Sequence, residues 1–529
     1  MRRPISKKLV NLLSKIPVIT RGEIPSVKIR AICSDSRHVQ PGDAFFAIKG
    51  GSFDGFNYIP SAIEKGASLI VGNRADPKNL SVPYLEIDDD PHKALAWLAA
   101  ATQNFPARSL RMIGVTGTDG KTSTSSMIHH ILTQSGVKAG MISTVNALIG
   151  NQEIDTGFHV TTPDSPEIQA ILAEMVQAGM THCVLESTSH GLAQGRAIAS
   201  EFDIAVITNV THEHFDYHGD WQHYLEAKGL LFESLWSTTP KKIGNPRLAI
   251  LNKDDQSYSF LERVSPPGHL SYSRLNQADL WAENINNSPT ELSFICHIDE
   301  LSYQVNSPMI GFYNVSNCLA ALATCVKGLG IPAETAITAL ATQRTVPGRM
   351  ERIDLGQDFI AIVDFAHTPN ALAVALETAR GLTQGKVIAV FGSAGLRDRE
   401  KRRMMPKESI KSADMTILTA EDPRTESLAA ILQDMADAAI SVGGVEGKNF
   451  LRVTDRGDAI RKAISLAKPG DLVISFGKGH EQSMCFLTTE YLWDDRTAMR
   501  AALAEHLGVE GPAMPWLPTS EIGRENKIS

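Results

Sequence analysis

A run of glycine, lysine and hydroxyl residues is the clearest candidate for chemistry. The segment GVTGTDGKTSTSS, residues 114–126, follows an apolar run typical of a buried strand and precedes a segment typical of a helix. Glycines let backbone N–H groups curl around phosphate oxygens, and the N-terminus of a helix adds positive potential. Lys121 can reach β- and γ-phosphates, and the Thr122 hydroxyl can ligate Mg²⁺. We therefore expect a nucleotide-binding loop.

This loop departs from the pattern G-x-x-x-x-G-K-[ST], because Val115 stands where the first glycine should be. A glycine-rich turn with a chance lysine is the alternative, but the flanking strand and helix favour nucleotide binding. The motif does not tell what the nucleotide does, since switch GTPases, kinases and ligases all use such loops.

Acidic and histidine residues follow two further apolar runs. Glu186 ends the run HCVLE, and a carboxylate at a strand end beside a phosphate loop suits Mg²⁺, although an ordinary surface turn has the same sequence. A histidine-rich segment then precedes Lys228. Zinc is an alternative for it, but no cysteine lies there. By its residue type alone, Lys228 is expected to be a solvent-exposed lysine on a helix. The segment's candidate ligands are His212, His214, Asp216, His218 and His223.

The pattern of apolar residues predicts an α/β protein, and 529 residues predict two to four domains. Residues 1–107 read as mixed α/β, and residues 108–346 alternate strands and helices around the phosphate loop. Residues 347–529 alternate continuous apolar strands with helices, which predicts a parallel sheet covered on both faces. Ligands bind at the carboxyl ends of such strands, so the loop EDPR at 421–424 should face a cleft.

Composition excludes several classes of function. The net charge is −8 with no long basic block, so neither nucleic acid nor a membrane surface is an expected partner. No run of eighteen apolar residues exists that could be inserted in a membrane. The basic, partly apolar start predicts a short amphipathic helix rather than a signal peptide. Six cysteines without a C-x-x-C pair indicate reduced thiols and a cytoplasmic protein.

Seven segments in chain order resemble motifs of the Mur ligases of peptidoglycan synthesis, particularly of members that add the third amino acid of the peptide. They are GTDGKTS, ESTSHGL, NVTHEHFDYHG with the following EAK, GFYNVSNCLAA, PGRMERID, DFAHTPNAL and GKGHE. The resemblance implies three domains: an N-terminal mixed α/β domain that binds the UDP end of the substrate, a central P-loop ATPase-like domain, and a C-terminal Rossmann-like domain that brings the amino acid.

The resemblance also implies a reaction. ATP phosphorylates the carboxylate of UDP-N-acetylmuramoyl-L-alanyl-D-glutamate, the amine of a diamino acid attacks the acyl phosphate, and phosphate leaves. Because a carboxylate and a γ-phosphate repel each other, Mg²⁺ and lysine must offset their charges. The implied partners are these small molecules, and we expect a monomer.

The same resemblance assigns residues to ATP and metal. Lys121, Glu186, His214 and Lys228 are the implied catalytic set. Lys228 matches a lysine that CO₂ converts to a carbamate, which explains a lysine among cation ligands; the metal ligands would be Thr122, Glu186, His214 and this carbamate. The implied ATP contacts are Gly117, Thr118, Asp119, Gly120, Lys121, Thr122, Ser123, Asn314, Asn317, Arg349, Asp364 and His367.

Further matches concern the other two substrates. Thr161 and Thr162 could alternatively cap the helix after Pro163, Asn314 and Asn317 could be capping or turn residues, and Asp35 and Arg37 could be a local ion pair. The implied contacts to the UDP-linked dipeptide are Ser36, Thr161, Thr162, Thr188, Gln194 and Arg196. Those to the incoming amino acid are Arg397, Glu421, Asp422, Pro423, Arg424, Gly477 and Glu481.

The loop EDPR bears on the choice of amino acid. The family pattern associated with meso-diaminopimelate is Asp-Asn-Pro-Arg, so Glu421 and Asp422 depart from it and Arg424 is retained. Arginine can grip the distal carboxylate of diaminopimelate in a bidentate manner, and lysine and ornithine lack that carboxylate. Asp422 could instead pair with the distal ammonium, or neutralise Arg424, or cap the next helix. We favour diaminopimelate, with lysine or ornithine as the alternative.

Two other functional hypotheses are also compatible with parts of the sequence. One is another ATP-dependent amide ligase, such as a folylpolyglutamate-synthase-like enzyme, against which the DSR segment and the EDPR loop argue. The other is an ATP-binding scaffold without catalysis, against which the joint presence of Lys121, Glu186, His214 and Lys228 argues.

Overall fold

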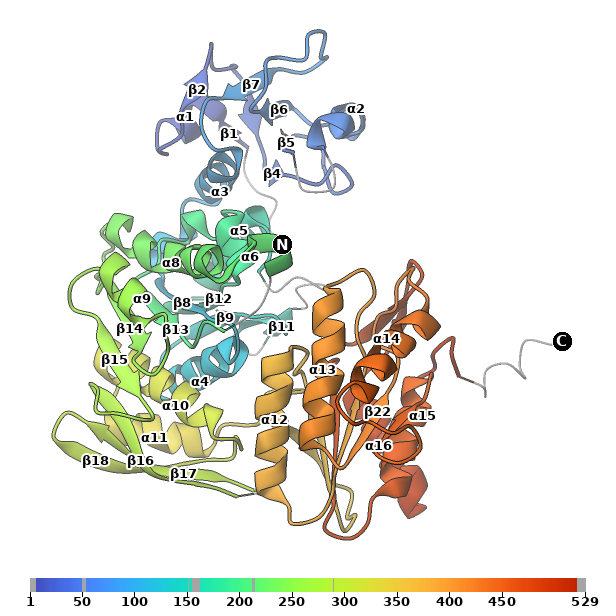
Figure 1. Ribbon diagram of the computed structural model, residues 1–529. Helices are drawn as coiled ribbons and strands as arrows, with labels where there is room; N and C mark the ends of the chain where they lie inside the picture. The colour runs from blue at the N-terminus through green and yellow to red at the C-terminus, as the bar shows by residue number, and fades with distance from the viewer. Residues whose placement is uncertain are drawn as a thin grey trace.

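The computed structural model describes residues 6–49, 54–150, 152–154, 162–211, 215–288 and 290–520. Three large sheets follow one another along the described part of the chain, in the blue, cyan-to-yellow and orange-to-red parts of Figure 1. Each sheet contains parallel strands joined through helices, so the predicted α/β class is confirmed. In the described part of the chain, no helix combines the length and apolarity that crossing a bilayer requires.

The N-terminal sheet has five strands, of which all but the first in spatial order run parallel. Its middle strands are fully apolar and buried, as expected for strands covered on both faces. The predicted opening helix is α1 (Leu9–Leu13). The other two α-helices described in this part of the chain are α2 (Ile59–Glu64) and α3 (Pro91–Thr102). The strand order is β2 (Thr20–Arg21), β7 (Tyr84–Ile87), β6 (Leu69–Gly72), β5 (Ala44–Ala47) and β4 (Ile32–Cys33); β1 (Lys7–Lys8) pairs separately with β3 (Lys28–Ile29).

The central sheet has eleven strands, with a parallel middle and antiparallel edges. In spatial order they are β11 (Gln152–Ile154), β10 (Ala147–Ile149), β9 (Ala139–Ile142), β12 (His182–Glu186), β8 (Arg111–Thr116), β13 (Ile204–Ile207), β14 (Leu248–Asn252), β15 (Leu270–Ser273), β16 (Leu280–Asn287), β17 (Leu292–Ile298) and β18 (Leu301–Ser307). Its helices are α4 (Lys121–Gln134), α5 (Ser165–Gln177), α6 (Ser189–Ala193), α7 (Phe215–His218), α8 (Trp221–Ser237), α9 (Tyr258–Val264), α10 (Tyr313–Leu322) and α11 (Ala333–Ala341).

The C-terminal sheet has six strands in the order β19 (Glu351–Ile353), β20 (Ile360–Asp364), β24 (Leu472–Phe476), β21 (Val387–Phe391), β22 (Met415–Leu418) and β23 (Phe450–Arg452). All but β19 run parallel. Separate apolar clusters cover its two faces, which explains the continuous apolar strands. The helices are α12 (Pro369–Leu382), α13 (Arg399–Ser412), α14 (Leu428–Ile440), α15 (Arg456–Leu466) and α16 (Asp495–Leu507); β25 (Ser483–Phe486) and β26 (Thr489–Leu492) form a hairpin.

Parallel register brings the carboxyl ends of neighbouring strands together. Glu186 at the end of β12 pairs with Val115 in β8, next to the start of the phosphate loop. Asp364 at the end of β20 pairs with Phe476 in β24, just before the segment GKGHE. The residues that the sequence marks as chemical therefore lie at the carboxyl edges of the central and C-terminal sheets.

A fully buried ion pair supports the carboxyl edge of the C-terminal sheet. The Arg456 guanidinium donates to both carboxylate oxygens of Asp495, at 2.7 and 2.6 Å, and to the carbonyls of Ala420 and Phe476 at 3.2 and 2.6 Å. These carbonyls end the segments that lead into EDPR and GKGHE. Burial alone would raise the pKa of Asp495, but Arg456 and the hydrogen bond from Trp493 hold the pKa below its ordinary value.

We predict that Arg456→Met lowers the free energy of unfolding by about 3 to 5 kcal/mol, because Asp495 is left as an unpaired buried charge. The measurement is the urea midpoint of unfolding. Arg461→Met on the same helix is the matched control. Because the pair of Arg461 with Glu505 is partly exposed, this change should lower the free energy of unfolding by about 1 kcal/mol or less. Equal losses in the two variants would contradict this assignment.

Candidate functional site

Close packing determines the backbone conformation of the phosphate loop between β8 and α4. A Cβ added at Gly117 would overlap the Thr208 hydroxyl, and one at Gly120 would overlap the side-chain oxygen of Asn317. Gly120 also has a φ of +83°, which glycine adopts without strain. The loop amides of Thr118 and Asp119 donate to the backbone and side chain of Asn209, at 2.7 and 3.1 Å. Only glycine therefore fits these two positions.

The proposed metal ligands Thr122 and Glu186 lie in contact. The Thr122 hydroxyl is 3.2 and 3.1 Å from the two carboxylate oxygens of Glu186, and both side chains are buried. Thr144 donates to the same carboxylate through its amide and its hydroxyl, at 3.1 and 2.8 Å. This is a set of oxygen donors at the start of α4, and hard divalent cations such as Mg²⁺ prefer oxygen. The residues present fit that ion.

Lys228 is not the solvated lysine that its residue type alone suggests. Its side chain is 1% exposed, and its amine donates to the carbonyl of Gly117 at 2.7 Å. The amine also lies 4.3 Å from the ring centre of Tyr224. Helix α8, which Asp220 caps, thus directs Lys228 onto the phosphate loop. His214 lies outside the described residues, as do Thr161 and His212.

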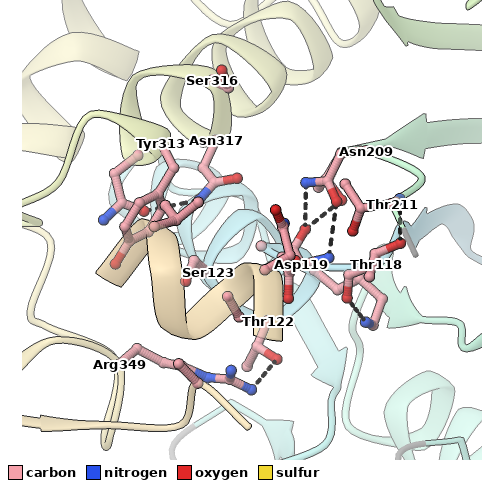
Figure 2. A pocket seen from close by; sticks show the side chains of 18 of the residues that line it. Thr118, Asp119, Thr122, Ser123, Asn209, Thr211, Tyr313, Ser316, Asn317 and Arg349 are labelled. Carbon is pink, nitrogen blue, oxygen red and sulfur yellow. Dashed lines mark hydrogen bonds between the residues drawn. The ribbon is translucent and has the colours of Figure 1, made fainter. Parts of the chain in front are cut away.

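A cavity of about 430 Å³ joins the central and C-terminal parts of the chain. Figure 2 shows the phosphate loop on one side of it, Tyr313 and Asn317 of α10 on another, and Arg349 reaching Thr122. Asn317 donates to Asn314 at 2.8 Å inside the buried face of α10, so neither residue caps that helix. All but one of the proposed ATP contacts line the cavity, and the remaining one, Gly117, adjoins it; the lining contacts are Thr118, Asp119, Gly120, Lys121, Thr122, Ser123, Asn314, Asn317, Arg349, Asp364 and His367.

The C-terminal side of this cavity is fixed by charge and hydrogen bonds. Arg349 donates to the Thr122 hydroxyl at 3.3 Å, and its guanidinium lies 4.3 Å from the ring centre of Phe365. Asp364 accepts from the amides of Met350 and Ala366, both at 2.8 Å, and burial raises the pKa of its carboxyl. The His367 ring nitrogen lies 3.0 Å from the Phe365 carbonyl.

Four of the proposed substrate residues form one network beside Glu186. The hydroxyls of Thr162 and Thr188 lie 3.1 Å apart, and Arg196 donates to the Thr162 carbonyl at 2.7 Å and to Gln194 at 3.0 Å. Thr188 caps α6, whereas Thr162 makes no cap on α5. Ser36 is buried and remote in the chain from this network, and Asp35 and Arg37 form the local ion pair considered from the sequence, at 2.7 Å.

The loop EDPR runs beside the hairpin β25–β26. The Arg424 amide donates to the Cys485 carbonyl at 3.1 Å, and the Leu487 amide donates to the Arg424 carbonyl at 2.8 Å. Glu421 is buried against Gly477, where a Cβ would overlap its carboxylate. Pro423 is buried, whereas Arg397 is exposed. The Arg424 guanidinium donates to the Gly395 carbonyl at 3.3 Å and has no ion-pair partner among the described residues.

Asp422 has a partner that the sequence did not suggest. Its carboxylate lies 3.1 Å from the amine of Lys478, which also lies 2.6 Å from Glu481, and it accepts the Cys485 amide at 2.8 Å. It therefore does not neutralise Arg424, and Ser427 rather than Asp422 caps α14.

Comparison with known families agrees with this geometry. Family models match residues 28–103 (Mur ligase family, catalytic domain), 115–325 (Mur ligase middle domain) and 348–479 (Mur ligase, glutamate ligase domain). The UDP-N-acetylmuramoyl-L-alanyl-D-glutamate–2,6-diaminopimelate ligase of Geobacillus thermodenitrificans (strain NG80-2) is 38% identical over 500 residues, 94% of this chain and 99% of that protein. The chain belongs to the Mur ligase family.

Two further similarities cover almost the whole chain. The UDP-N-acetylmuramyl-tripeptide synthetase of Roseiflexus sp. (strain RS-1) is 40% identical, over 92% of this chain and 96% of that protein. A solved structure of a UDP-N-acetylmuramoyl-L-alanyl-D-glutamate–2,6-diaminopimelate ligase has a TM-score of 0.65 and 28% identity, covering 95% of this chain and all of that one. Mur ligases are ATP-dependent ligases that form carbon–nitrogen bonds, and the three-domain architecture predicted from the sequence is that of the family.

Sequence reasoning missed a buried ion pair that holds two loops of this Mur ligase together. Arg402 of α13 is 1% exposed and grips Glu426 in a bidentate manner, at 2.8 and 2.7 Å. Glu426 also accepts the Leu396 amide at 3.0 Å, which joins the loop after β21 to the loop EDPR. Its hydrogen bond to Arg402 lowers the pKa of Glu426 from 4.5 to about 2. The only sequence feature that could have indicated this pair is the glutamate two residues after EDPR.

This lowered pKa sets a pH window for stability. Because the carboxyl of Glu426 has a lower pKa folded than unfolded, the pair stabilises the fold fully above the unfolded pKa, and the contribution is lost as pH falls towards about 2. We predict that Arg402→Met is less stable than the natural protein by a constant amount above about pH 5, and that the difference narrows on acidification. Urea titrations between about pH 3 and pH 7 measure it.

Arg399→Met is the control for this prediction, since Arg399 is mostly exposed and lies 3.7 Å from the same carboxylate. It should change stability little at any pH. A difference between Arg402→Met and the natural protein that stays constant down to about pH 3 would show that Glu426 does not carry the effect.

Proposed function

We propose that this chain joins meso-2,6-diaminopimelate to UDP-N-acetylmuramoyl-L-alanyl-D-glutamate with ATP, through an acyl phosphate, in the cytoplasmic synthesis of peptidoglycan precursors. The single observation that carries the proposal is the shared cavity: a phosphate loop and an oxygen-donor pair on one side, Arg349 and Asp364 on the other. The relatives named for this reaction, 38% identical over nearly the whole chain, support the choice of substrates.

The roles of the residues follow from their positions. Lys121 and the loop amides that do not donate to Asn209 would bind the ATP phosphates. The Lys121 amine lies 2.7 Å from the Thr118 carbonyl, and Lys121 lines the cavity. Thr122, Glu186, His214 and a carbamate on Lys228 would hold Mg²⁺, whose charge offsets the repulsion between phosphate and carboxylate. Asn314 and Asn317 flank the adenine side, and Arg349, Asp364 and His367 bring the C-terminal domain onto the nucleotide.

Substrate binding is divided among the domains. We propose residues 1–107 as the UDP-binding domain, with Ser36 as a contact, residues 108–346 as the ATP-binding domain, and residues 347–529 as the amino-acid-binding domain. Thr161, Thr162, Thr188, Gln194 and Arg196 would bind the dipeptide, and the hydrogen-bonded network that the last four form beside Glu186 supports this. We propose a monomer, because one chain carries all three sites.

The choice of diaminopimelate rests on Arg424. Its guanidinium lies in the amino-acid loop without a carboxylate partner among the described residues, and Asp422 is paired elsewhere. A planar guanidinium binds a carboxylate through two hydrogen bonds, and only diaminopimelate of the three candidates carries a distal carboxylate. Arg397, Glu421, Pro423, Gly477 and Glu481 would complete the amino-acid site.

The test is phosphate release and amide formation with ATP, Mg²⁺, UDP-N-acetylmuramoyl-L-Ala-D-Glu and each of meso-diaminopimelate, L-lysine and L-ornithine. Diaminopimelate should give the highest kcat/KM. Arg424→Ala should lower kcat/KM for diaminopimelate by about 100-fold and leave that for lysine nearly unchanged, because the lost hydrogen bonds are made only to the distal carboxylate. Arg399→Ala is the control, since this arginine is exposed. Preference for lysine or ornithine by the natural protein would reject diaminopimelate.

A second experiment concerns Lys228. Incubation with ¹³C-bicarbonate should give a carbamate carbon signal by NMR that is absent from Lys228→Ala, and this variant should lose at least about 100-fold in kcat. Lys253→Ala is the matched control, because Lys253 is exposed and its amine donates to the Gln277 carbonyl, away from the phosphate loop. A carbamate signal that survives in Lys228→Ala would place the modification on another residue.

A further inference from the structure

Lys478, the lysine of GKGHE, is buried in the C-terminal domain and is not among the residues to which the proposed reaction gives a role. Its side chain has no exposed surface. The amine lies 3.1 and 3.2 Å from the two carboxylate oxygens of Asp422 and 2.6 Å from Glu481. Burial by itself would lower the pKa of Lys478, but the charges of Glu481 and Asp422 more than offset this and raise it. Lys478 is therefore a fixed positive charge between two acids of the amino-acid loops.

Two other buried charged groups, Glu421 and Arg456, lie in and next to the loop EDPR. Glu421 is buried against Gly477 with one carboxylate oxygen that has no hydrogen-bond partner among the described residues, and burial raises its pKa. Arg456 beneath the loop is paired with Asp495. Among the described residues, Lys478 is thus the only cation that forms an ion pair with Asp422.

Two residues of this loop have a backbone conformation that is uncommon for residues other than glycine. Asp422 and Arg424 both have positive φ, +36° and +52°, in the region that L-residues rarely adopt. Asp422 is held by Lys478 and by the Cys485 amide, and Arg424 by two backbone hydrogen bonds to the hairpin. The contact between Lys478 and Asp422 therefore fixes where the aspartate points and which charge it neutralises.

We propose that Lys478 is a positioning residue that determines amino-acid specificity: it neutralises Asp422 and so leaves Arg424 free to bind the distal carboxylate of the incoming diamino acid. The inference rests on the proposed ligase reaction. Without Lys478, the aspartate would be a buried anion in the same loop as Arg424, where it would compete with the substrate carboxylate for the guanidinium.

This proposal makes Lys478 necessary only because residue 422 is an aspartate. With asparagine at that position, no anion competes for Arg424, and the loss of Lys478 then acts only through its contact with Glu481, which belongs to the proposed amino-acid site. The effect of a change at Lys478 must therefore depend on residue 422, and a double-mutant cycle measures that dependence.

The experiment compares the natural protein, Asp422→Asn, Lys478→Met and the double variant in the three-amino-acid assay. Lys478→Met should raise KM for diaminopimelate about 100-fold and reduce its preference over lysine, with KM for ATP unchanged. Asp422→Asn, at a residue of the amino-acid loop itself, supplies the reference KM for the double variant. In the double variant, KM should stay within about tenfold of the KM of Asp422→Asn, because Lys478 then has no aspartate to neutralise. Lys462→Met, which replaces an exposed lysine on α15, is the control.

Equal effects of Lys478→Met in the natural protein and in the Asp422→Asn variant would overturn the proposal, as would an unchanged preference for diaminopimelate in Lys478→Met. If Lys478→Met fails to fold, Lys478→Arg, which keeps the positive charge, replaces it in the test. Lys478→Arg should retain the preference for diaminopimelate over lysine. Loss of that preference despite a normal urea midpoint would reject the role of Lys478 in specificity. A natural protein that forms no amide with any diamino acid would instead reject the proposed function.

Discussion

The site depends on one constraint: the linker at residues 347–350 contacts loops of both the central and the C-terminal sheet. Gly348 has a φ of +65°, and a Cβ there would overlap the backbone of Gly479 and His480. The next residue, Arg349, reaches Thr122 in the phosphate loop, and the Met350 amide is bonded to Asp364. This short linker thus holds the carboxyl edge of the central sheet against that of the C-terminal sheet, and the cavity between them is lined by the phosphate loop, Glu186, Arg349 and Asp364.

Buried ion pairs build the second half of the site. Arg456 with Asp495 supports the segments that follow β22 and β24, Arg402 with Glu426 joins the loops after β21 and β22, and Lys478 neutralises Asp422 in the loop EDPR. Each pair links segments at least 24 residues apart in the chain. Breaking such a pair leaves one buried charge without a partner, so the three pairs stabilise the observed arrangement of these loops.

The sequence predicted the elements well because apolar runs and glycines are local signals. β8, α4, β12, β20, β21, β22 and β24 all lie where their apolar runs indicated, whereas the three-residue strand β23 was too short to be recognised. Lys228 could be selected only through the resemblance to Mur ligases, since nothing local shows that α8 directs its amine to the Gly117 carbonyl. The partner of Asp422 was not predicted either, because Lys478 lies 56 residues away and only the fold brings the two together.

The central claim is that the cavity between the two sheets transfers a phosphoryl group from ATP to a carboxylate before the amide forms. The most direct measurement uses UDP-N-acetylmuramoyl-L-Ala-D-Glu in which both oxygens of the reacting carboxylate are ¹⁸O, with ATP, Mg²⁺ and diaminopimelate, and analyses the released phosphate by mass spectrometry. The account predicts one ¹⁸O in each phosphate formed with the amide, because the carboxylate oxygen leaves with the phosphoryl group. Unlabelled phosphate accompanying labelled amide would contradict it.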